Sequence, residues 1–338
     1  MALPICYNSY SSALAKLVRR ARLQDCLIRL QKKGVFSLAA VMTASYTQEN
    51  DTQTGALLLD GRVYAKELKA NLKQATAAFV VQHGFAPGLA VVLVGDDQAS
   101  IEYSNVLVKA ARNSGFEAVS HVLPGHATTA ELAALLENLN HDQTVHGISL
   151  QWPLPPQISL EAATNALDPC KDVEGYHPLN TGRLFSNLDT FVPPTPLGGM
   201  LLLDYYGYNV EGKLCLQIGA GVTVGRPLLA LLTGVNATVL VANKLTPPAI
   251  LRQLCAQADF VFCAAGKANL VTGEMLKPGA VVMDFGINFV NDKMVGDIDF
   301  ESVRRVASAV TPTPGGTGPV TTVALLQNVL KAAKQQVQ

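Results

Sequence analysis

The stretch "KLCLQIGAGVTVGRPLLALLT", residues 213–233, decides the fold. Its apolar start ends at a turn that carries Gly219, Gly221 and Gly225, and apolar residues at helical spacing follow. Glycines in such a turn let the backbone approach a pyrophosphate, and the helix N-terminus offers N–H groups to it. The stretch predicts the strand, glycine turn and helix of a dinucleotide site. An ordinary strand–helix turn is the alternative.

The rest of the chain continues this alternation of strands and helices. Around the glycine turn, strands are predicted at 237–243, 259–266 and 280–288, and helices at 200–208, 247–257 and 318–336. A Pro-rich break at 191–199 precedes this block. In the first half, apolar runs at 87–95, 117–125 and 146–155 alternate with helices. The fold class is therefore α/β with two parallel-sheet domains.

Local signals place two helices of the first half more closely. A short strand and a turn at Asp60-Gly61 precede an amphipathic helix within residues 56–85. Thr128 stands three residues before Glu131, which predicts a capping box at the start of a helix over 128–142.

The composition excludes several classes of protein. Lysine plus arginine and aspartate plus glutamate both number 26, so no net charge attracts nucleic acid or an anionic membrane. The six cysteines show no C-x-x-C spacing, which favours buried thiols over a metal site or disulfides. The mean hydropathy is +0.23, but the uncharged run at 227–243 contains Gly234, Asn236 and Thr238. Helix, turn and strand explain that run better than a membrane span.

The N-terminal residues 1–54 form an extension outside the fold. The segment up to Tyr46 is rich in Arg, Lys and Ser and has one acidic residue, Asp25. It has the character of a transit segment, while the alternative is an over-long start with Met42 as the true beginning. The expected location is cytoplasmic, or a mitochondrion or plastid if the extension is a transit segment.

Several blocks occur in a characteristic order. They are "VVLVGDDQASIEY", "GISLQWPLP", "KDVEGYHPLNTGRL", "PTPLGG", "IGAGVTVGRP", "MDFGIN", "GDIDF" and "TPTPGGTGPVTT". Together they resemble the methylenetetrahydrofolate dehydrogenase/cyclohydrolase family of the FolD type, from about Leu57 to the C-terminal helix.

The resemblance implies a fold and two linked activities. Residues 55–196 with 318–338 form a folate-binding catalytic domain, onto which the C-terminal helix packs, and 197–317 form a Rossmann domain that binds NADP. The family oxidises 5,10-methylenetetrahydrofolate to 5,10-methenyltetrahydrofolate and hydrolyses that product to 10-formyltetrahydrofolate. The resemblance therefore implies a multifunctional oxidoreductase and hydrolase of one-carbon metabolism and purine biosynthesis, and a homodimer formed through the Rossmann domain.

The first helix of the family pattern departs from the family. The pattern reads Y-x-x-x-K-x-K, and Tyr103 matches its tyrosine, which stacks on the substrate. Leu107 stands at the catalytic lysine, and Lys109 matches the outward lysine. Six residues after Tyr103, Lys109 lies about 240° round the helix and is not expected to replace the missing amine. Leucine offers no proton shuttle, so the cyclohydrolase step is expected to be weakened or lost.

The resemblance assigns three further residues of the folate side. Gln151 matches the glutamine that supports the catalytic lysine, and it has no such partner here. Glu174 stands at the aspartate that binds the pterin edge, while Asp172 is expected to serve the turn. Trp152 stands where leucine is usual, as a substrate-side residue or, more simply, a core aromatic. The expected catalytic residues are Tyr103, Gln151 and Glu174.

The two glycine turns complete the expected sites. The substrate-binding set adds Pro314, Gly315, Gly316, Thr317 and Gly318 to Tyr103, Leu107, Gln151, Trp152 and Glu174. The cofactor set is Gly219, Ala220, Gly221, Thr223, Gly225, Lys244 and Ile287. The strand at 237–243 ends in Asn243 and Lys244 with no carboxylate for a ribose, so a 2′-phosphate and NADP are favoured; a solvated surface lysine is the alternative. No metal is expected.

Three functions follow from these features. The first is an NADP-dependent methylenetetrahydrofolate dehydrogenase with doubtful cyclohydrolase activity. The second is a catalytically inactive paralogue that binds folate or a nucleotide, which Leu107, Glu174 and Gly221 together favour. The third, an oxidoreductase for another small carbonyl compound, draws on the Rossmann half alone.

Overall fold

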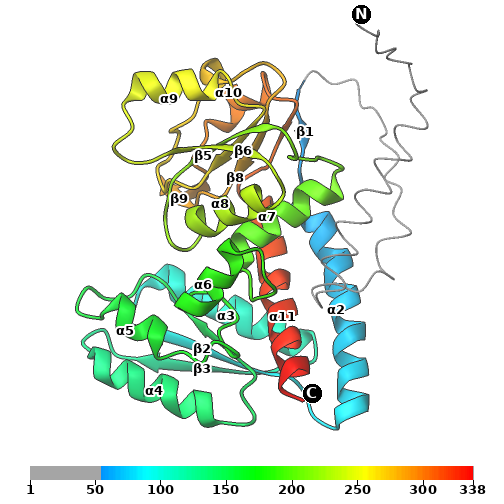
Figure 1. Cartoon of the computed structure of the whole chain (residues 1–338), viewed down its shortest axis with the longest axis vertical. Helices are drawn as coiled ribbons and strands as arrows, with labels where there is room; N and C mark the ends of the chain where they lie inside the picture. Colours follow the sequence, from blue (N-terminus) through cyan, green and yellow to red (C-terminus); the bar gives the residue numbers. More distant parts are fainter. Residues whose placement is uncertain (1–54, 338) are drawn as a thin grey trace, which may run out of the picture. The chain divides into compact units, whose positions relative to one another are not determined.

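The apolar runs of the first half form a three-stranded parallel sheet in the computed structural model, which describes residues 55–337 (Figure 1). The strand order is β3 (Glu117–Leu123), β2 (Gly88–Val94) and β4 (Gly147–Leu150). Every residue of β2 is buried because it is the central strand with covered faces, which explains its unbroken apolar run. The predicted β-α-β-α-β order of this half is confirmed.

The second half forms a six-stranded sheet in which every pairing is parallel. Its order is β1 (Leu57–Leu58), β11 (Ala309–Val310), β8 (Val281–Asp284), β7 (Phe260–Cys263), β5 (Leu214–Ile218) and β6 (Thr238–Ala242). The order reverses at β5, which lies between β6 and β7, and ligands of such sheets bind at that switch point. Because the strands are parallel, their C-terminal ends share one side, named here the carboxyl edge.

The position of β1 differs from the predicted domain boundary. That boundary places the chain from residue 55 onward with the folate half, but Leu57 pairs with Ala309 and Leu58 with Val310 in the six-stranded sheet. A strand of two residues carries no periodicity that could indicate its sheet. The chain therefore leaves the nucleotide half for the folate half directly after its first strand.

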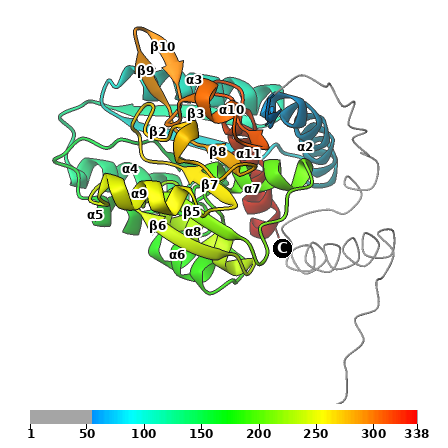
Figure 2. The same cartoon turned by 90° about the horizontal axis from the view of Figure 1, so that it is seen from above.

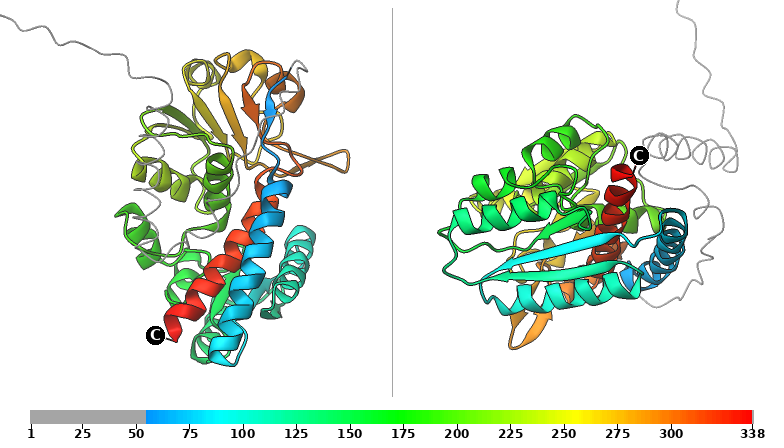
Figure 3. Two further views of the ribbon diagram at one scale, coloured as in Figure 1. Left: turned by 90° about the vertical axis from the view of Figure 1, so that its right-hand side faces the viewer. Right: turned by 90° about the horizontal axis from the view of Figure 1, so that it is seen from below.

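Three long helices connect the two sheets. They are α2 (Gly61–His83), α7 (Pro194–Tyr205) and α11 (Thr317–Gln336). The C-terminal helix α11 lies along α2 and α7 and also contacts β2 and β4 (Figures 1 and 3). One hydrophobic core joins Val91 of β2, Phe262 of β7 and Leu326 of α11. The prediction that the last helix packs on the first domain is confirmed.

The remaining elements surround the sheets. They are α3 (Gln98–Asn113), α4 (Thr129–His141), α5 (Leu160–Asn165), α6 (Pro178–Phe185), α8 (Gly225–Gly234), α9 (Pro248–Cys255), η2 (Gly273–Met275), α10 (Phe300–Arg304), β9 (Asn288–Val290) and β10 (Lys293–Val295). The hairpin β9–β10 projects from the molecule (Figure 2). Helix α4 begins with the predicted capping box between Thr128 and Glu131.

The apolar run at 227–243 is resolved into most of α8, a turn and β6, as predicted. Among the helices of residues 55–337, none combines the length and the apolar character needed to cross a membrane. The transit-like extension, 1–54, lies outside the described residues. Both alternatives for the N-terminus, and the location that depends on them, stay predictions.

Candidate active site

Helix α3 carries Tyr103 and Leu107, the residues expected at the tyrosine and lysine positions of the family pattern, one turn apart. Its buried residues are Ser100, Ser104, Leu107 and Ala111, which recur at helical spacing. Leu107 has no exposed surface and belongs to the hydrophobic core. Tyr103, one turn earlier, is half-buried and packs against the same core. The side chain at position 107 is therefore a core residue of this protein.

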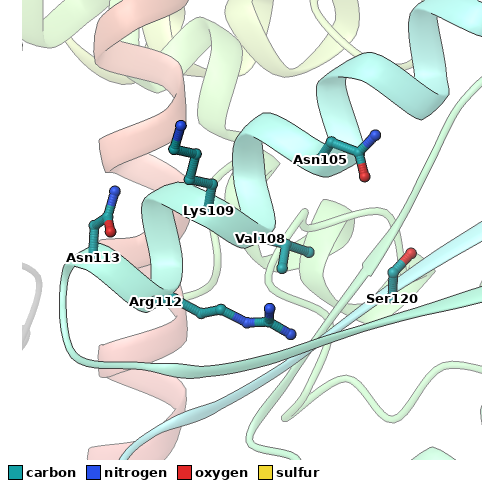
Figure 4. A pocket seen from close by; sticks show the side chains of 6 residues that line it. All are labelled: Asn105, Val108, Lys109, Arg112, Asn113 and Ser120. Atoms are coloured by element: carbon teal, nitrogen blue, oxygen red, sulfur yellow. The ribbon is translucent and has the colours of Figure 1, made fainter.

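Lys109 lies on the outer surface of α3, as predicted. It is exposed and lines a surface pocket of about 450 Å³ with Asn105, Arg112 and Ser120 (Figure 4). None of the residues expected to bind substrate lines this pocket. The structure therefore agrees with the expectation that Lys109 faces outward.

The loop that carries Glu174 runs beside β4. Asp172 forms a parallel bridge with Ile148, and the Ile148 N–H donates to the Lys171 carbonyl at 2.7 Å. From α11, the Asn328 amide donates to the Val173 carbonyl at 2.8 Å and to the Val192 carbonyl at 2.9 Å. These contacts hold Glu174 alongside the end of β4.

A hydrogen-bonded chain joins the two polar residues predicted on the folate side. The Ser149 hydroxyl donates to Oε1 of Glu174 at 2.6 Å, and Nε2 of Gln151 donates to the Ser149 hydroxyl oxygen at 2.8 Å. All three side chains are buried. Gln151, expected to be without its usual partner, is bonded to Ser149 instead. We refer to these residues as the Gln151–Ser149–Glu174 chain.

Burial dominates the electrostatics of this cluster. It raises the pKa of Glu174 to about 7, against the lowering effect of the Ser149 hydrogen bond and with a further increase from Asp172. The pKa of Tyr103 is raised by burial and by the nearby Glu174 charge. Within residues 55–337, no cationic group contributes to the pKa shift of either side chain. The described part of the site thus combines a titratable carboxyl group with aromatic hydroxyls.

Trp152 and Asp172 have largely structural surroundings. The Trp152 ring packs against the core of the three-stranded sheet and meets Tyr176 edge-on, with ring centroids 5.5 Å apart. Oδ2 of Asp172 accepts from the His177 N–H at 2.8 Å and from the Asn180 amide at 2.9 Å. The expectation that Asp172 serves the turn is confirmed.

The glycine turn after β5 is held by close backbone packing. Gly219 has φ of +108°, and a Cβ atom there would lie 2.0 Å from the Ala264 carbonyl oxygen. A Cβ on Gly225 would lie 2.4 Å from the Gly219 oxygen, whereas Gly221 faces open space. No side chain caps α8 at its N-cap, Val224. In the first turn of α8, the Arg226 N–H donates to the Gly221 carbonyl at 2.9 Å and Pro227 has no N–H. The N–H groups that could bind a phosphate are therefore those of the turn before the helix.

Two more predicted cofactor residues lie at the same carboxyl edge. Ile218 of β5 pairs with Ala242 of β6, which brings the turn after β6 next to Gly219. That turn is closed by a hydrogen bond of 3.0 Å from the Leu245 N–H to Asn243 Oδ1, and it leaves Lys244 exposed. Ile287 follows β8 and is 63% exposed. The edge thus offers a cation beside the glycine turn and an uncovered apolar side chain.

The turn at 314–318 follows β11, also at the carboxyl edge. Gly315 has φ of +112°, and its carbonyl accepts from the Gly61 N–H of α2 at 2.9 Å. Gly316 and Thr317 are buried, while Pro314 and Gly318 are exposed. The turn therefore joins the six-stranded sheet to the start of α11 and leaves two of its five residues open to a ligand.

Sequence reasoning missed four residues of the site region: Ser149, Tyr176, Asp297 and Asn328. Asp297 is fully buried; its Oδ2 accepts from the Ala265 N–H at 2.6 Å and its Oδ1 from the Lys267 N–H at 2.9 Å. These bonds hold the loop after β7 at the carboxyl edge. The signal for Ser149 was a hydroxyl residue within a short, otherwise apolar buried strand. Asn328 gave a similar signal inside an apolar helix.

Two parallel α/β halves, one with a glycine cradle at its switch point, define a two-domain enzyme of the dinucleotide-binding class. Residues 59–174 match the family model of the tetrahydrofolate dehydrogenase/cyclohydrolase catalytic domain, and residues 193–337 match that of the NAD(P)-binding domain of the same family. The chain belongs to the tetrahydrofolate dehydrogenase/cyclohydrolase family.

Individual relatives agree with this assignment. The chain is 49% identical over 280 residues to the bifunctional protein FolD of Herpetosiphon aurantiacus, covering 82% of this chain and 97% of the relative. It is similar to the solved FolD of Campylobacter jejuni, with 41% identity, a TM-score of 0.79 and coverage of 83% and 99%. The Trypanosoma brucei FolD, solved with NADP and an inhibitor, shows 35% identity, a TM-score of 0.82 and coverage of 85% and 100%.

Proposed function

We propose that this protein oxidises 5,10-methylenetetrahydrofolate to 5,10-methenyltetrahydrofolate with NADP, and that its cyclohydrolase step is weakened or lost. The observation that carries the proposal is Leu107, a fully buried core residue one helical turn from Tyr103. The family membership supports the folate substrate, and the Gln151–Ser149–Glu174 chain supports its binding on the folate side.

The cofactor proposal rests on the fit of the carboxyl edge. At Gly219 and Gly225 the backbone packs so closely that a Cβ atom has no room. The start of α8 has no side-chain cap, and Lys244 supplies a cation for a 2′-phosphate. When bound, the nicotinamide accepts the hydride. The further expected contacts, Ala220, Gly221, Thr223 and Ile287, are proposed for the same ligand.

Physical chemistry separates the two steps of the family. Loss of hydride leaves a cationic methenyl product, so the first step needs orientation and no nearby amine. Hydrolysis adds water, which loses a proton, and the C–N bond that breaks needs a proton on nitrogen. Leu107 can neither accept nor donate that proton. Such a loss typically costs about 10²–10⁴-fold in rate.

An oligomeric state is proposed together with this function, and one alternative function is kept. Homodimer formation through the nucleotide half is proposed from the family resemblance. A second candidate function, a folate- or nucleotide-binding protein without turnover, draws its support from Leu107 together with Gly221, which has no hydroxyl in the open space it faces.

The test is purified protein assayed for both steps. We expect NADP-dependent formation of methenyl-folate, and hydrolysis of methenyl-folate at its spontaneous rate. Ordinary enzymatic hydrolysis would contradict the proposed loss, and the absence of NADP reduction with intact folate binding would favour the non-catalytic candidate.

A pair of variants at one position sharpens the test. Leu107→Lys restores an amine, and Leu107→Met changes the core by a similar volume without one. We expect hydrolysis at least about tenfold faster in Leu107→Lys than in Leu107→Met, the low end of general acid–base effects because the position is buried. Equal rates in two folded variants would show that more than the amine is missing.

A further inference from the structure

Ser149 stands out in β4 because it is a polar residue in a fully buried strand. All four residues of the strand are buried, and Ser149 has no exposed surface. A buried hydroxyl costs free energy unless it is hydrogen-bonded. Its two bonds, to Gln151 and Glu174, meet this requirement inside the site. None of the roles that the family resemblance assigns to residues of this chain falls on Ser149.

The direction of these two bonds is determined by the donors present. A serine hydroxyl has one proton, and a carboxylate oxygen can only accept. Because the Gln151 amide donates to the Ser149 oxygen, the hydroxyl proton is free to point at Oε1 of Glu174. With the amide of Gln151, which follows β4, donating to its oxygen, the Ser149 hydroxyl becomes an oriented donor toward the carboxylate.

We propose that Ser149 is a positioning residue that holds the Glu174 carboxylate in place for the N3–H and 2-amino donors of the pterin edge. The inference rests on the proposed function and names the residue on which its substrate recognition depends. A glutamate has one more rotatable bond than the aspartate of the family pattern, so its carboxylate needs an additional restraint. The bond of 2.6 Å to Oε1 supplies that restraint and leaves Oε2 for the substrate.

The protonation of Glu174 supports this role. Burial raises its pKa, whereas the Ser149 bond favours the ionised form. The other titratable groups that face it are Tyr103 from α3 and Tyr176 and Asp172 from its own loop. Removing Ser149 takes away the one lowering influence, so substrate binding by the carboxylate should require a higher pH.

The experiment measures KM for methylenetetrahydrofolate between pH 6 and 9. In Ser149→Ala we expect KM to rise about tenfold at pH 7, the acid limb of kcat/KM to move about one unit upward, and kcat to change less than about threefold. Thr76→Val is the matched control, because it removes a buried hydroxyl that donates to the Leu72 carbonyl of α2. The control should retain the wild-type pH profile.

Two further variants make the result decisive. Ser149→Thr keeps the hydroxyl and should keep the acid limb, whereas Glu174→Gln should abolish it. In a Glu174→Gln background, Ser149→Ala should cause no further pH dependence. An unchanged profile in Ser149→Ala, or an acid limb that persists in Glu174→Gln, would overturn the inference. If Ser149→Ala does not fold, the comparison of Ser149→Thr with Glu174→Gln decides.

Direct binding separates this inference from the proposed function. The probe is 5-formyltetrahydrofolate, titrated into wild type and Ser149→Ala by calorimetry at pH 6.5 and 8.5. If wild type shows no turnover but binds the probe with the predicted pH dependence, the catalytic proposal fails and the role of Ser149 stands. If neither turnover nor binding occurs, both fail.

Discussion

The nucleotide half of the site is formed mainly by backbone, and the folate half mainly by side chains. At the carboxyl edge, the cradle is made of backbone: Gly219 and Gly225 pack against the carbonyl oxygens of neighbouring segments. On the folate side, the site is made of side chains, with Leu107 in the core and Glu174 held by Ser149. By the resemblance, the folate side is expected to depart from the family pattern at Leu107 and Glu174, and the cradle at Gly221, which carries no hydroxyl.

The difference shows which chemistry each half can lose. A backbone cradle is altered only by residues that add a Cβ atom, and such a change displaces the main chain. A side-chain site changes its proton chemistry through one substitution that still packs well. Under the proposed function, hydride transfer needs both ligands oriented but no amine at position 107, whereas hydrolysis needs a proton carrier there. A chain of this kind would then retain one step and lose the other.

The largest effect is expected where a Cβ atom is added to the closely packed backbone of the cradle. In Gly219→Ala, the new Cβ atom lies 2.0 Å from the Ala264 oxygen, at a φ of +108°. We expect NADP-dependent turnover to fall about 1,000-fold, or about 4 kcal/mol. Gly182→Ala in α6 is the matched control and should change turnover less than about threefold, because nothing lies within 4 Å of its Cβ and it belongs to neither binding set. Similar losses in both would contradict the distinction.

The second effect concerns how the free energy of unfolding depends on pH through the buried Glu174 on the folate side. Burial raises the pKa of Glu174 from 4.5 to about 7, so the native state binds its proton more tightly than the unfolded chain does. The free energy of unfolding contributed by this group therefore falls as the pH rises from about 4.5 to 7. Glu174→Gln should gain about 3 kcal/mol relative to wild type between pH 4.5 and pH 8.

Urea unfolding of both proteins at the two pH values measures this gain. Glu137→Gln, which removes an exposed carboxylate from α4, is the control. A gain of the same size in the control, or none in Glu174→Gln, would show that Glu174 is not held in its raised-pKa environment.

A smaller effect concerns the choice of cofactor. Lys244 is exposed at the carboxyl edge, so its attraction for a 2′-phosphate is partly screened by solvent. Lys244→Ala should raise KM for NADP about tenfold, or about 1.4 kcal/mol, and leave KM for NAD unchanged. Equal changes with both cofactors would point to a structural role for this lysine.

The smallest effect lies at Lys109. Because it faces a surface pocket and not the substrate-side cluster, Lys109→Met should alter neither dehydrogenase nor hydrolysis rates by more than about twofold. Rates are compared with those of Leu107→Lys under the same conditions. A clear loss in Lys109→Met would indicate that the outer lysine reaches the reacting folate after all.

The sequence was most informative where one physical rule determines one feature. The continuous apolar run of β2 predicts a buried central strand, and the structure confirms it. The hairpin β9–β10 was not predicted, because its strands are short and largely exposed. Its signal was Asn291-Asp292, which both adopt positive φ in the two-residue turn, as hairpin turns of this type require.

The site was less predictable than the fold. The departure at Leu107 follows from the family resemblance, and the outward position of Lys109 follows from helical spacing. The burial of Leu107 and the exposure of Lys109 agree with that spacing. The partner of Glu174 was missed because a serine within an apolar strand specifies no partner until Ile148 is bridged to Asp172. Contacts between segments distant in sequence decide such pairs, and local patterns do not contain them.

The pairing of β1 with β11 has a consequence for how the protein is made. Leu57 emerges from the ribosome about 250 residues before Ala309, its partner in the sheet. The nucleotide half therefore completes folding only when nearly the whole chain has been synthesised. A recombinant fragment cut at residues 197–317 would lack an edge strand and would expose β11 to intermolecular pairing, so the halves cannot be studied as separate gene products without carrying the first strand along.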